Sequence, residues 1–316
     1  MQLIRGLHNL KSQVANGCVA TIGNYDGVHL GHQKQLKILN IKARDKNIPS
    51  LVILFEPHPE SFFGWTRNAI FLSSFREKIL LLSKYGIQIV LLLKFNYQLA
   101  ALDAESFVRD ILVKKLNLRQ LVVGDDFVFG NRRAGNIDLL YRLSKIYSFS
   151  LVQLDTFRID GIRVSSSLIR EMILKDDFAQ IPRFLGRFYS ILGRVIKGKG
   201  IAHNLGFPTA NIYLGTKRKL SFGGVYLVKV RKLCEHEYLY GIANLGFKPT
   251  FNHVYSQKQL EVHILNFTGD LYGALLEIAF CQKLREEMKF ASVKELKKQL
   301  EKDLLLVKLL SDPLKY

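Results

Sequence analysis

The residues with the clearest capacity for chemistry lie in TIGNYDGVHLGH, residues 21–32, where two histidines stand three positions apart among glycines. An apolar, β-branched run precedes this stretch, so a buried strand is expected to lead through a turn into a helix. Histidines at this spacing can bind zinc, but the usual zinc motif has further ligands and a nearby glutamate, and none is adjacent. Two surface histidines at a helix start are the other simple explanation.

A strand, a glycine-bearing turn and a helix start place backbone N–H groups and the positive end of the helix against phosphate. Histidines at that point can donate hydrogen bonds to phosphate oxygens as negative charge develops during group transfer. We therefore favour phosphate binding by His29 and His32 over both alternatives.

A second group of candidate residues lies in LGFPTANI, residues 205–212. The proline fixes a turn, and Thr209 and Asn211 follow one strand-step apart, so both face the same side. Hydroxyl and amide oxygens suit Mg²⁺ shared with nucleotide phosphates. Taken in isolation, a strand that opens with two exposed polar residues explains this pattern better.

Two polar residues, Glu261 and His263, interrupt the apolar strand LEVHIL two positions apart and thus face the same side. An acidic side chain on a strand is usually a solvated outer residue.

The stretch GRVIKGKG, residues 193–200, imitates a phosphate-binding loop. We reject that interpretation because Gly200 replaces the required Ser or Thr and the surrounding pattern is β-rich.

The elements that must position these residues differ between the two halves of the chain. In the first half, amphipathic helical patterns separate apolar runs, and we expect strands at 18–22, 51–55, 87–95, 121–123 and 149–154. Continuous apolar strands between helices predict a doubly wound α/β domain whose parallel sheet is covered on both faces. Such sheets bind ligands at the carboxyl ends of their strands.

In the second half, short β-like runs follow one another with turn signals between them, at 190–195, 224–230, 238–243, 261–265 and 274–280. This rhythm predicts a small antiparallel β-barrel. A terminal helix should start at Ser292, where Glu295 completes a capping box. We place the domain boundary at Gly186, giving domains 1–186 and 187–316.

The composition limits the class of protein. Lys and Arg total 46 against 27 Asp and Glu, a net charge of +19, which favours anionic partners without choosing among them. The basic residues are scattered, so a generally basic, solvated surface is at least as good an explanation as a nucleic-acid site. We see no signal peptide and no run of about 18 apolar residues that could span a membrane. Three widely spaced cysteines fit free thiols in the cytoplasm.

Several stretches, in order, resemble the bacterial bifunctional riboflavin kinase/FAD synthetase family. GNYDGVHLGH resembles the H-x-G-H motif of its FMN adenylyltransferase module. LFEPHP (54–59), VGDDFVFGNRRAG (123–135) and RVSSSLIR (163–170) resemble three further segments of that module. LGFPTANI, FGGVYLVKV (222–230), GIANLGFKPTF (241–251) and LEVHILNFTGDLYG (260–273) resemble its riboflavin kinase module. The resemblance covers essentially the whole chain.

The resemblance implies a role for each matching residue. Glu261 would be the general base that takes the proton of the ribityl 5′-hydroxyl. Thr209 and Asn211 would hold Mg²⁺ with ATP. The residues implied in binding ATP or its phosphates, besides His29 and His32, are Gly23, Asn24, Asp26, Gly31, Arg163, Ser165, Ser166, Arg170, Gly198 and Gly200. Those implied in flavin binding are Asp126, Phe127, Asn244 and Phe251.

The sequence departs from the family pattern at three places. His203 and Lys248 stand where the family usually has Arg, and neither offers the guanidinium fork that grips phosphate in two places. Tyr25 replaces the usual Phe and keeps the ring.

We accordingly expect a two-step enzyme: riboflavin and ATP give FMN at the barrel, and FMN and ATP give FAD at the α/β domain. We expect ATP, riboflavin, FMN and FAD as its partners, no nucleic acid or membrane, and a monomer or weak oligomer. One alternative is an H-x-G-H nucleotidyltransferase for another phosphate, such as a phosphopantetheine or nicotinate nucleotide, which leaves the barrel unexplained. The other is a basic RNA-binding protein, which predicts basic stripes interleaved with aromatic residues.

Overall fold

The computed structural model describes residues 1–10, 12–64, 70–198, 206–215, 218, 220–247 and 258–310. The chain divides into two compact units, residues 1–166 and 167–316. The strands of the first unit are β1 (Gln2–Arg5), β2 (Cys18–Ile22), β3 (Ser50–Glu56), β4 (Ile89–Lys94), β5 (Leu118–Gly124), β6 (Ser150–Leu154), β7 (Arg158–Ile159) and β8 (Ile162–Arg163). Its helices are α1 (Leu30–Asp45), α2 (Pro59–Phe62), α3 (Phe75–Lys84), α4 (Tyr97–Ala100), α5 (Ala104–Ser106), a π-helix (Phe107–Val113) and α6 (Ile137–Ile146), with 3-10 turns at Leu7–Asn9, Ser12–Val14 and Asn131–Arg133.

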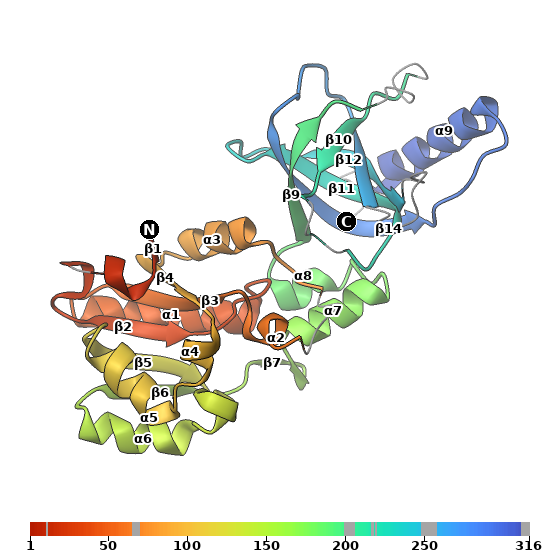
Figure 1. The fold of residues 1–316 in the computed structure, drawn as a ribbon. Helices are drawn as coiled ribbons and strands as arrows, with labels where there is room; N and C mark the ends of the chain where they lie inside the picture. The colour runs from red at the N-terminus through yellow and green to blue at the C-terminus, as the bar shows by residue number, and fades with distance from the viewer. Residues whose placement is uncertain are drawn as a thin grey trace. The chain divides into compact units, whose positions relative to one another are not determined.

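The main sheet of the first unit has the strand order β1-β4-β3-β2-β5-β6, and its neighbouring strands are parallel (Figure 1). From β2 the chain proceeds outward through β3 to β4, then crosses to β5 on the other side of β2. This reversal makes the carboxyl ends of β2 and β5 a topological switch point, the position at which sheets of this class bind ligands. The predicted doubly wound domain is confirmed. Strand β1 was not anticipated, because a four-residue edge strand leaves little periodic signal.

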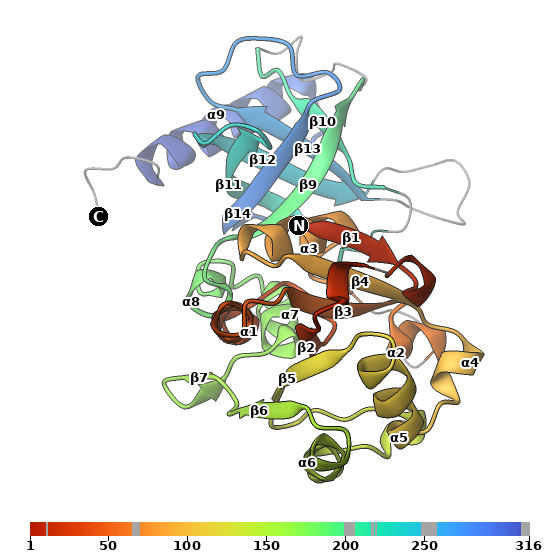
Figure 2. The ribbon, with the colours of Figure 1, turned by 90° about the vertical axis from the view of Figure 1, so that its left-hand side faces the viewer.

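Alternate residues of the strands face opposite sides of this sheet, and each side has its own helical cover (Figure 2). Val19, Val52 and Val90 pack on one side against Leu36 of α1 and Leu82 of α3. The intervening strand residues pack on the other side against the π-helix and α6. Because both sides are buried, the strands are continuously apolar, which is the pattern seen in the sequence.

The second unit is a closed antiparallel barrel with flanking helices. Its elements are α7 (Ser166–Leu174), which starts at the last residue of the first unit, α8 (Ile181–Leu185), β9 (Tyr189–Ile196), β10 (Ala210–Tyr213), β11 (Gly224–Lys232), β12 (Leu239–Phe247), β13 (Lys258–Ile264), β14 (Leu275–Arg285) and α9 (Val293–Leu310). The barrel closes in the order β10-β13-β12-β11-β14-β9, and its paired strands are antiparallel. The predicted barrel with a terminal helix is confirmed.

Residues 167–186, which we expected in the first domain, are grouped with the barrel. Phe178, between α7 and α8, is fully buried, and its ring centroid lies 5.0 Å from Phe222 and 5.7 Å from Phe280 of β14. The Tyr226 hydroxyl lies 2.9 Å from the Asp176 carboxylate. Aromatic packing of this kind stabilises the barrel, so the segment before the predicted boundary belongs to its core.

Helix α9 is fixed to the barrel by a charged pair. Arg285, at the end of β14, donates to both carboxylate oxygens of Asp303, with a shortest distance of 2.7 Å. Asp303 is 3% exposed. At the start of the helix, Ser292 accepts from the Glu295 backbone, but the Glu295 carboxylate accepts from Ala291 N–H, so the predicted capping box closes one residue early.

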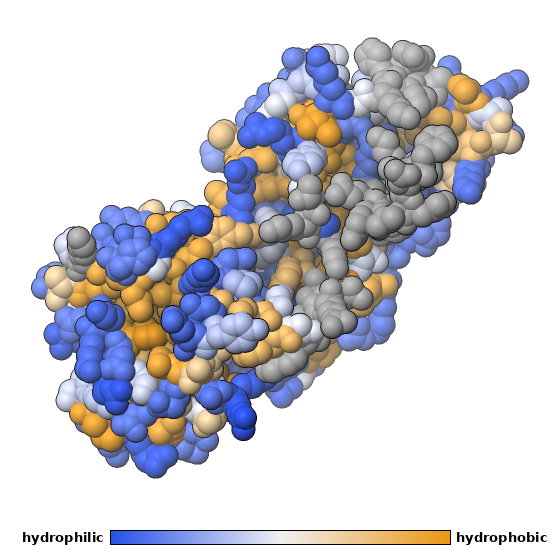
Figure 3. Space-filling view, in the orientation of Figure 1, coloured by the Kyte–Doolittle hydropathy of each residue, from blue (hydrophilic) through white to orange (hydrophobic). Residues whose placement is uncertain are grey.

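Figure 3 shows hydrophilic side chains interspersed with apolar ones over the visible face of each unit. Within the described part of the chain, no helix has both the length and the apolar character needed to cross a membrane.

Candidate active sites

The turn between β2 and α1 has an unusual backbone. Tyr25 and Val28 adopt φ values of 48° and 43°, in the left-handed region that residues other than glycine rarely occupy. Both residues are buried, Tyr25 at 1% exposure, so the surrounding core holds them in place. The result is a tight turn that places His29 at the N-cap of α1, after the carboxyl end of β2.

The two histidines of this turn form one unit. His29 caps α1, and its Nδ1 accepts a hydrogen bond from the His32 backbone N–H at 3.3 Å. This bond leaves Nε2 as the protonated, donating nitrogen of a neutral His29 ring. The two rings stack with centroids 3.7 Å apart and planes 18° apart. A Cβ at Gly31 would lie 3.2 Å from the His29 ring, so glycine lets the helix start pass close to it.

The environment of His32 keeps its ring neutral. Burial lowers the pKa of His32 well below its usual value, and the nearby His29 and Lys78 lower it further. Its Nδ1 is buried and has no hydrogen-bond partner among the described residues. Stacked imidazoles beside an ammonium group repel added positive charge, so the pair is suited to a ligand that brings negative charge.

The depressed pKa predicts a pH-dependent stability. Below pH 6.5 the unfolded chain binds a proton at His32 that the folded chain excludes, so folding stability is lost as the pH falls. The slope from this one group reaches about 1.4 kcal/mol per pH unit. We expect His32→Gln to lose less unfolding free energy than the unaltered protein between pH 7.5 and 5.5, as measured by urea titration. Identical losses in the two proteins would show that His32 is not held neutral.

Asp26 joins the turn to two other segments of the first unit. It is 3% exposed, and its carboxylate accepts hydrogen bonds from Leu72 N–H and Ser73 N–H, both at 3.0 Å. Its backbone carbonyl accepts from the Ser166 hydroxyl at 2.8 Å. The structure thus brings the RVSSS segment to the histidine turn, 140 residues away in sequence. The Asp26 carboxylate itself is turned toward the 72–73 segment.

Arg163 and Asp126, for which we expected phosphate and flavin binding, form an ion pair with each other. Each side chain remains at least half exposed, at 50% and 60%. Phe127 stacks on Phe129 with centroids 5.6 Å apart and packs against the core of the first unit. The pair therefore lies at an open surface, where an arriving anion can compete for the guanidinium group.

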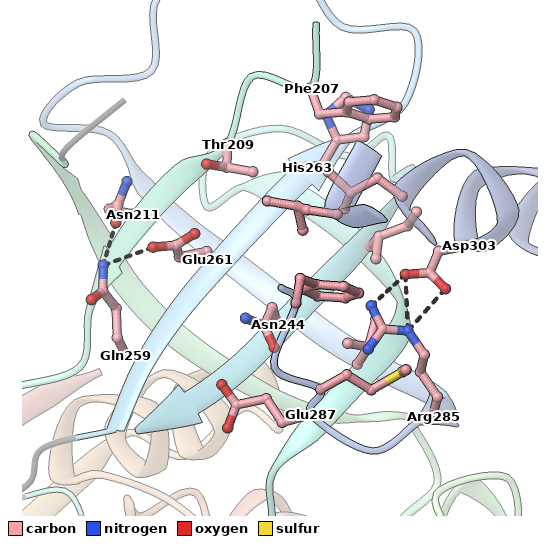
Figure 4. Close-up of a pocket in the computed structure, with 16 residues that line it drawn as sticks. Phe207, Thr209, Asn211, Asn244, Gln259, Glu261, His263, Arg285, Glu287 and Asp303 are labelled. Carbon is pink, nitrogen blue, oxygen red and sulfur yellow. Dashed lines mark hydrogen bonds and ion pairs between the residues drawn. The ribbon is translucent and has the colours of Figure 1, made fainter. Parts of the chain in front are cut away.

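In the barrel, the candidate residues lie in one row across successive strands. Strand pairing sets Asn211 of β10 opposite Glu261 of β13, and Glu261 opposite Asn244 of β12. The row continues through Val225 of β11 to Arg285 of β14. These residues line a cavity of about 300 Å³ whose far wall is formed by α9 and the segment before it (Figure 4). The cavity runs from polar groups at β10 to apolar side chains on the opposite wall, Met288 and Phe290 before α9 and Leu296 and Leu300 in it.

The polar end of the cavity is organised by Gln259, which we did not single out from the sequence. Its amide nitrogen donates to Asn211 Oδ1 and, at 3.0 Å, to Glu261 Oε1. Thr209 lines the same end. Any Cβ at Gly198 would overlap the Asn211 amide. Only glycine therefore lets the chain just after β9 pass this close to the Asn211 side chain. The signal for Gln259 was available, because it stands two positions before Glu261 on the same face.

His263 also lines the cavity and contacts the turn that precedes Thr209. Its Nδ1 lies 2.8 Å from the Pro208 carbonyl oxygen, and its ring meets the Phe207 ring edge-on at 5.7 Å. The contact fixes the turn that leads into Thr209.

The remaining predicted residues are placed as follows. Gly23 and Asn24 begin the histidine turn, Asn24 on the exposed side. Ser165 precedes α7, and Arg170 lies one turn into it, in the second unit. Gly200 and Phe251, like His203 and Lys248, lie outside the described residues.

Comparisons with known proteins identify the family of this chain. Residues 11–168 match a family model described as FAD synthetase, and residues 185–310 match one described as riboflavin kinase. A bifunctional riboflavin kinase/FMN adenylyltransferase of Haemophilus influenzae is 42% identical over 303 residues, covering 96% of this chain and 97% of that protein. The one from Escherichia coli K12 is 41% identical over 304 residues and covers 96% of both chains. The chain belongs to the bifunctional riboflavin kinase/FMN adenylyltransferase family.

A solved structure from Streptococcus pneumoniae, described as a macrolide-efflux protein, shares the fold. Its TM-score is 0.83 at 24% identity, covering 98% of this chain and 99% of that one. This likeness concerns the fold alone.

Membership of the riboflavin kinase/FMN adenylyltransferase family settles the choice of function made from the sequence. The two family models match in the expected order, so neither another H-x-G-H nucleotidyltransferase nor an RNA-binding protein is favoured. The histidine turn falls in the FAD synthetase region and the row across the barrel falls in the riboflavin kinase region.

Proposed function

We propose that the barrel cavity phosphorylates riboflavin to FMN and that the histidine turn after β2 transfers AMP from ATP to FMN, yielding FAD and pyrophosphate. The observation that carries this proposal is the row Asn211, Glu261 and Asn244. It sets a carboxylate between two amides on one side of a cavity that becomes apolar at its other end. A molecule with an alcohol at one end and an aromatic ring at the other matches that gradient.

In the kinase step, the Glu261 carboxylate takes the proton of the ribityl 5′-hydroxyl while that oxygen attacks the γ-phosphorus of ATP, and ADP leaves. Gln259 holds the carboxylate in place through its 3.0 Å hydrogen bond. The ring of the flavin lies over Val225 and Ile242, beneath α9. Gly198, just after β9, approaches the phosphates beside Asn211.

Magnesium fits the polar end of this cavity. Asn211 is 7% exposed, and its carbonyl oxygen has two lone pairs, of which Gln259 uses one. With the Thr209 hydroxyl it offers the hard oxygen ligands that Mg²⁺ takes. When bound, the ion would neutralise charge on the ATP phosphates. Among the described residues, no three His, Cys, Asp or Glu side chains come together to hold a metal.

In the adenylyl step, an FMN phosphate oxygen attacks the α-phosphorus of ATP, and pyrophosphate leaves. His29 Nε2–H and the N–H groups at the start of α1 donate to the phosphate oxygens. Arg163 exchanges its ion pair with Asp126 for one with phosphate, and the Ser165 and Ser166 hydroxyls bind the departing pyrophosphate. Asp126 and Phe127 then face the flavin.

The free thiols of Cys18, Cys234 and Cys281 support the cytoplasm as the place of action.

The direct test incubates the purified protein with riboflavin, ATP and Mg²⁺ and separates the flavins by chromatography. We expect FMN to form first and FAD to follow, and both to vanish when EDTA exceeds Mg²⁺. A protein that converts supplied FMN to FAD but never phosphorylates riboflavin would contradict the barrel assignment.

A further inference from the structure

Glu287, just after β14, lines the kinase cavity but has no role in the chemistry above. Its carboxylate lies directly over Gly246 of β12, where any Cβ would overlap it. The absence of a side chain at position 246 therefore creates a notch that this carboxylate fills. The φ of Gly246 is not in the left-handed region, so backbone conformation does not demand glycine there.

The notch lies beside the other acceptor groups of the cavity. Alternate residues of β12 share a face, so Ile242, Asn244 and Gly246 face the cavity in succession. In Figure 4 the Asn244 amide lies between the carboxylates of Glu261 and Glu287. Asn244 Oδ1 is buried and has no hydrogen-bond partner among the described residues. This part of the wall thus offers acceptor oxygens to a ligand that must supply donors.

The positions of these acceptors fit a short polyol. Neighbouring strands lie about 5 Å apart, so Asn244 is one strand spacing from Glu261, and the notch is roughly 7 Å further along β12. A ligand whose terminal hydroxyl lies at Glu261 and whose ring lies over Val225, in the same row across the strands, passes its remaining hydroxyls over Asn244 and beside the notch. The donors available on such a chain are hydroxyl groups.

We propose that Glu287, seated in the Gly246 notch, binds the secondary hydroxyls of the ribityl chain together with Asn244 and so selects flavins that carry this chain. The inference rests on the proposed kinase function of the cavity. Glu287 is a specificity residue, whereas Glu261 carries out the proton transfer.

The test compares riboflavin with lumiflavin, which has the same ring without the ribityl chain. Binding of each to the full chain is measured by flavin fluorescence, with Mg²⁺ and ADP present so that no turnover occurs. We expect Glu287→Ala to raise the riboflavin Kd about tenfold or more, because a charge-assisted hydrogen bond is lost. The lumiflavin Kd should stay unchanged within about twofold. Gly246→Ala should reproduce this effect with Glu287 still present, by displacing the carboxylate.

The matched control is Glu286→Ala, which removes the same charge one residue away. Glu286 is exposed and pairs with Lys283 at 2.5 Å, outside the cavity. The Glu286→Ala variant should bind riboflavin and lumiflavin with unchanged affinities. Equal weakening of riboflavin and lumiflavin by Glu287→Ala, or an unchanged riboflavin Kd, would overturn the inference. An unaltered protein that binds neither flavin would instead overturn the proposed function.

Discussion

Glu261→Gln is expected to lower FMN formation from riboflavin by about a thousandfold while FAD formation from supplied FMN continues at its normal rate. The amide cannot take a proton from the 5′-hydroxyl. It has nearly the same size as the carboxylate and keeps an oxygen for the hydrogen bond that Gln259 donates. The loss should therefore appear in kcat and leave the KM values nearly unchanged. Flavin chromatography with each substrate separately measures both steps.

The control for this variant is Glu286→Gln, an exposed acid of the same unit that does not line the cavity. It should keep both activities. If Glu261→Gln lost both steps together, the two reactions would not use separate sites. If it kept FMN formation, another group would be the base.

His29→Asn should have the reverse effect, with FAD formation lowered by about a hundredfold or more and FMN formation unchanged. Asparagine is chosen because it is a good N-cap residue, so it can still accept from the backbone of α1. What it removes is the imidazole that stacks on His32 and donates from Nε2. The measurement is the initial rate of FAD formation from FMN and ATP, with urea unfolding to check that stability is retained.

His8→Asn is the matched control, because His8 is exposed in the same unit and far from the turn in sequence. An unchanged rate of FAD formation in His29→Asn would remove this histidine from phosphate binding. Loss of FMN formation as well would show that the substitution disturbs the whole chain.

Much of the fold followed from local patterns. The continuous apolar runs at 18–22 and 51–55 predicted parallel strands because burial on both faces leaves no polar alternation. The shift to short runs with glycine-rich turns predicted the barrel. The place of residues 167–186 was not predictable, because Phe178 belongs to the barrel only through contacts with residues distant in sequence.

The sequence alone determined the residue types that can do the chemistry: histidines at a helix start, and a carboxylate, a hydroxyl and an amide on strands. Spacing within one strand or turn fixes which neighbours share a face, and that information is local. Only the tertiary structure decided that Glu261 lies between Asn211 and Asn244, that Ser166 reaches the turn at Asp26, and that Glu287 fills the space left by Gly246. Such contacts depend on strand register and chain crossings, which are set by packing of the whole unit and not by any short stretch.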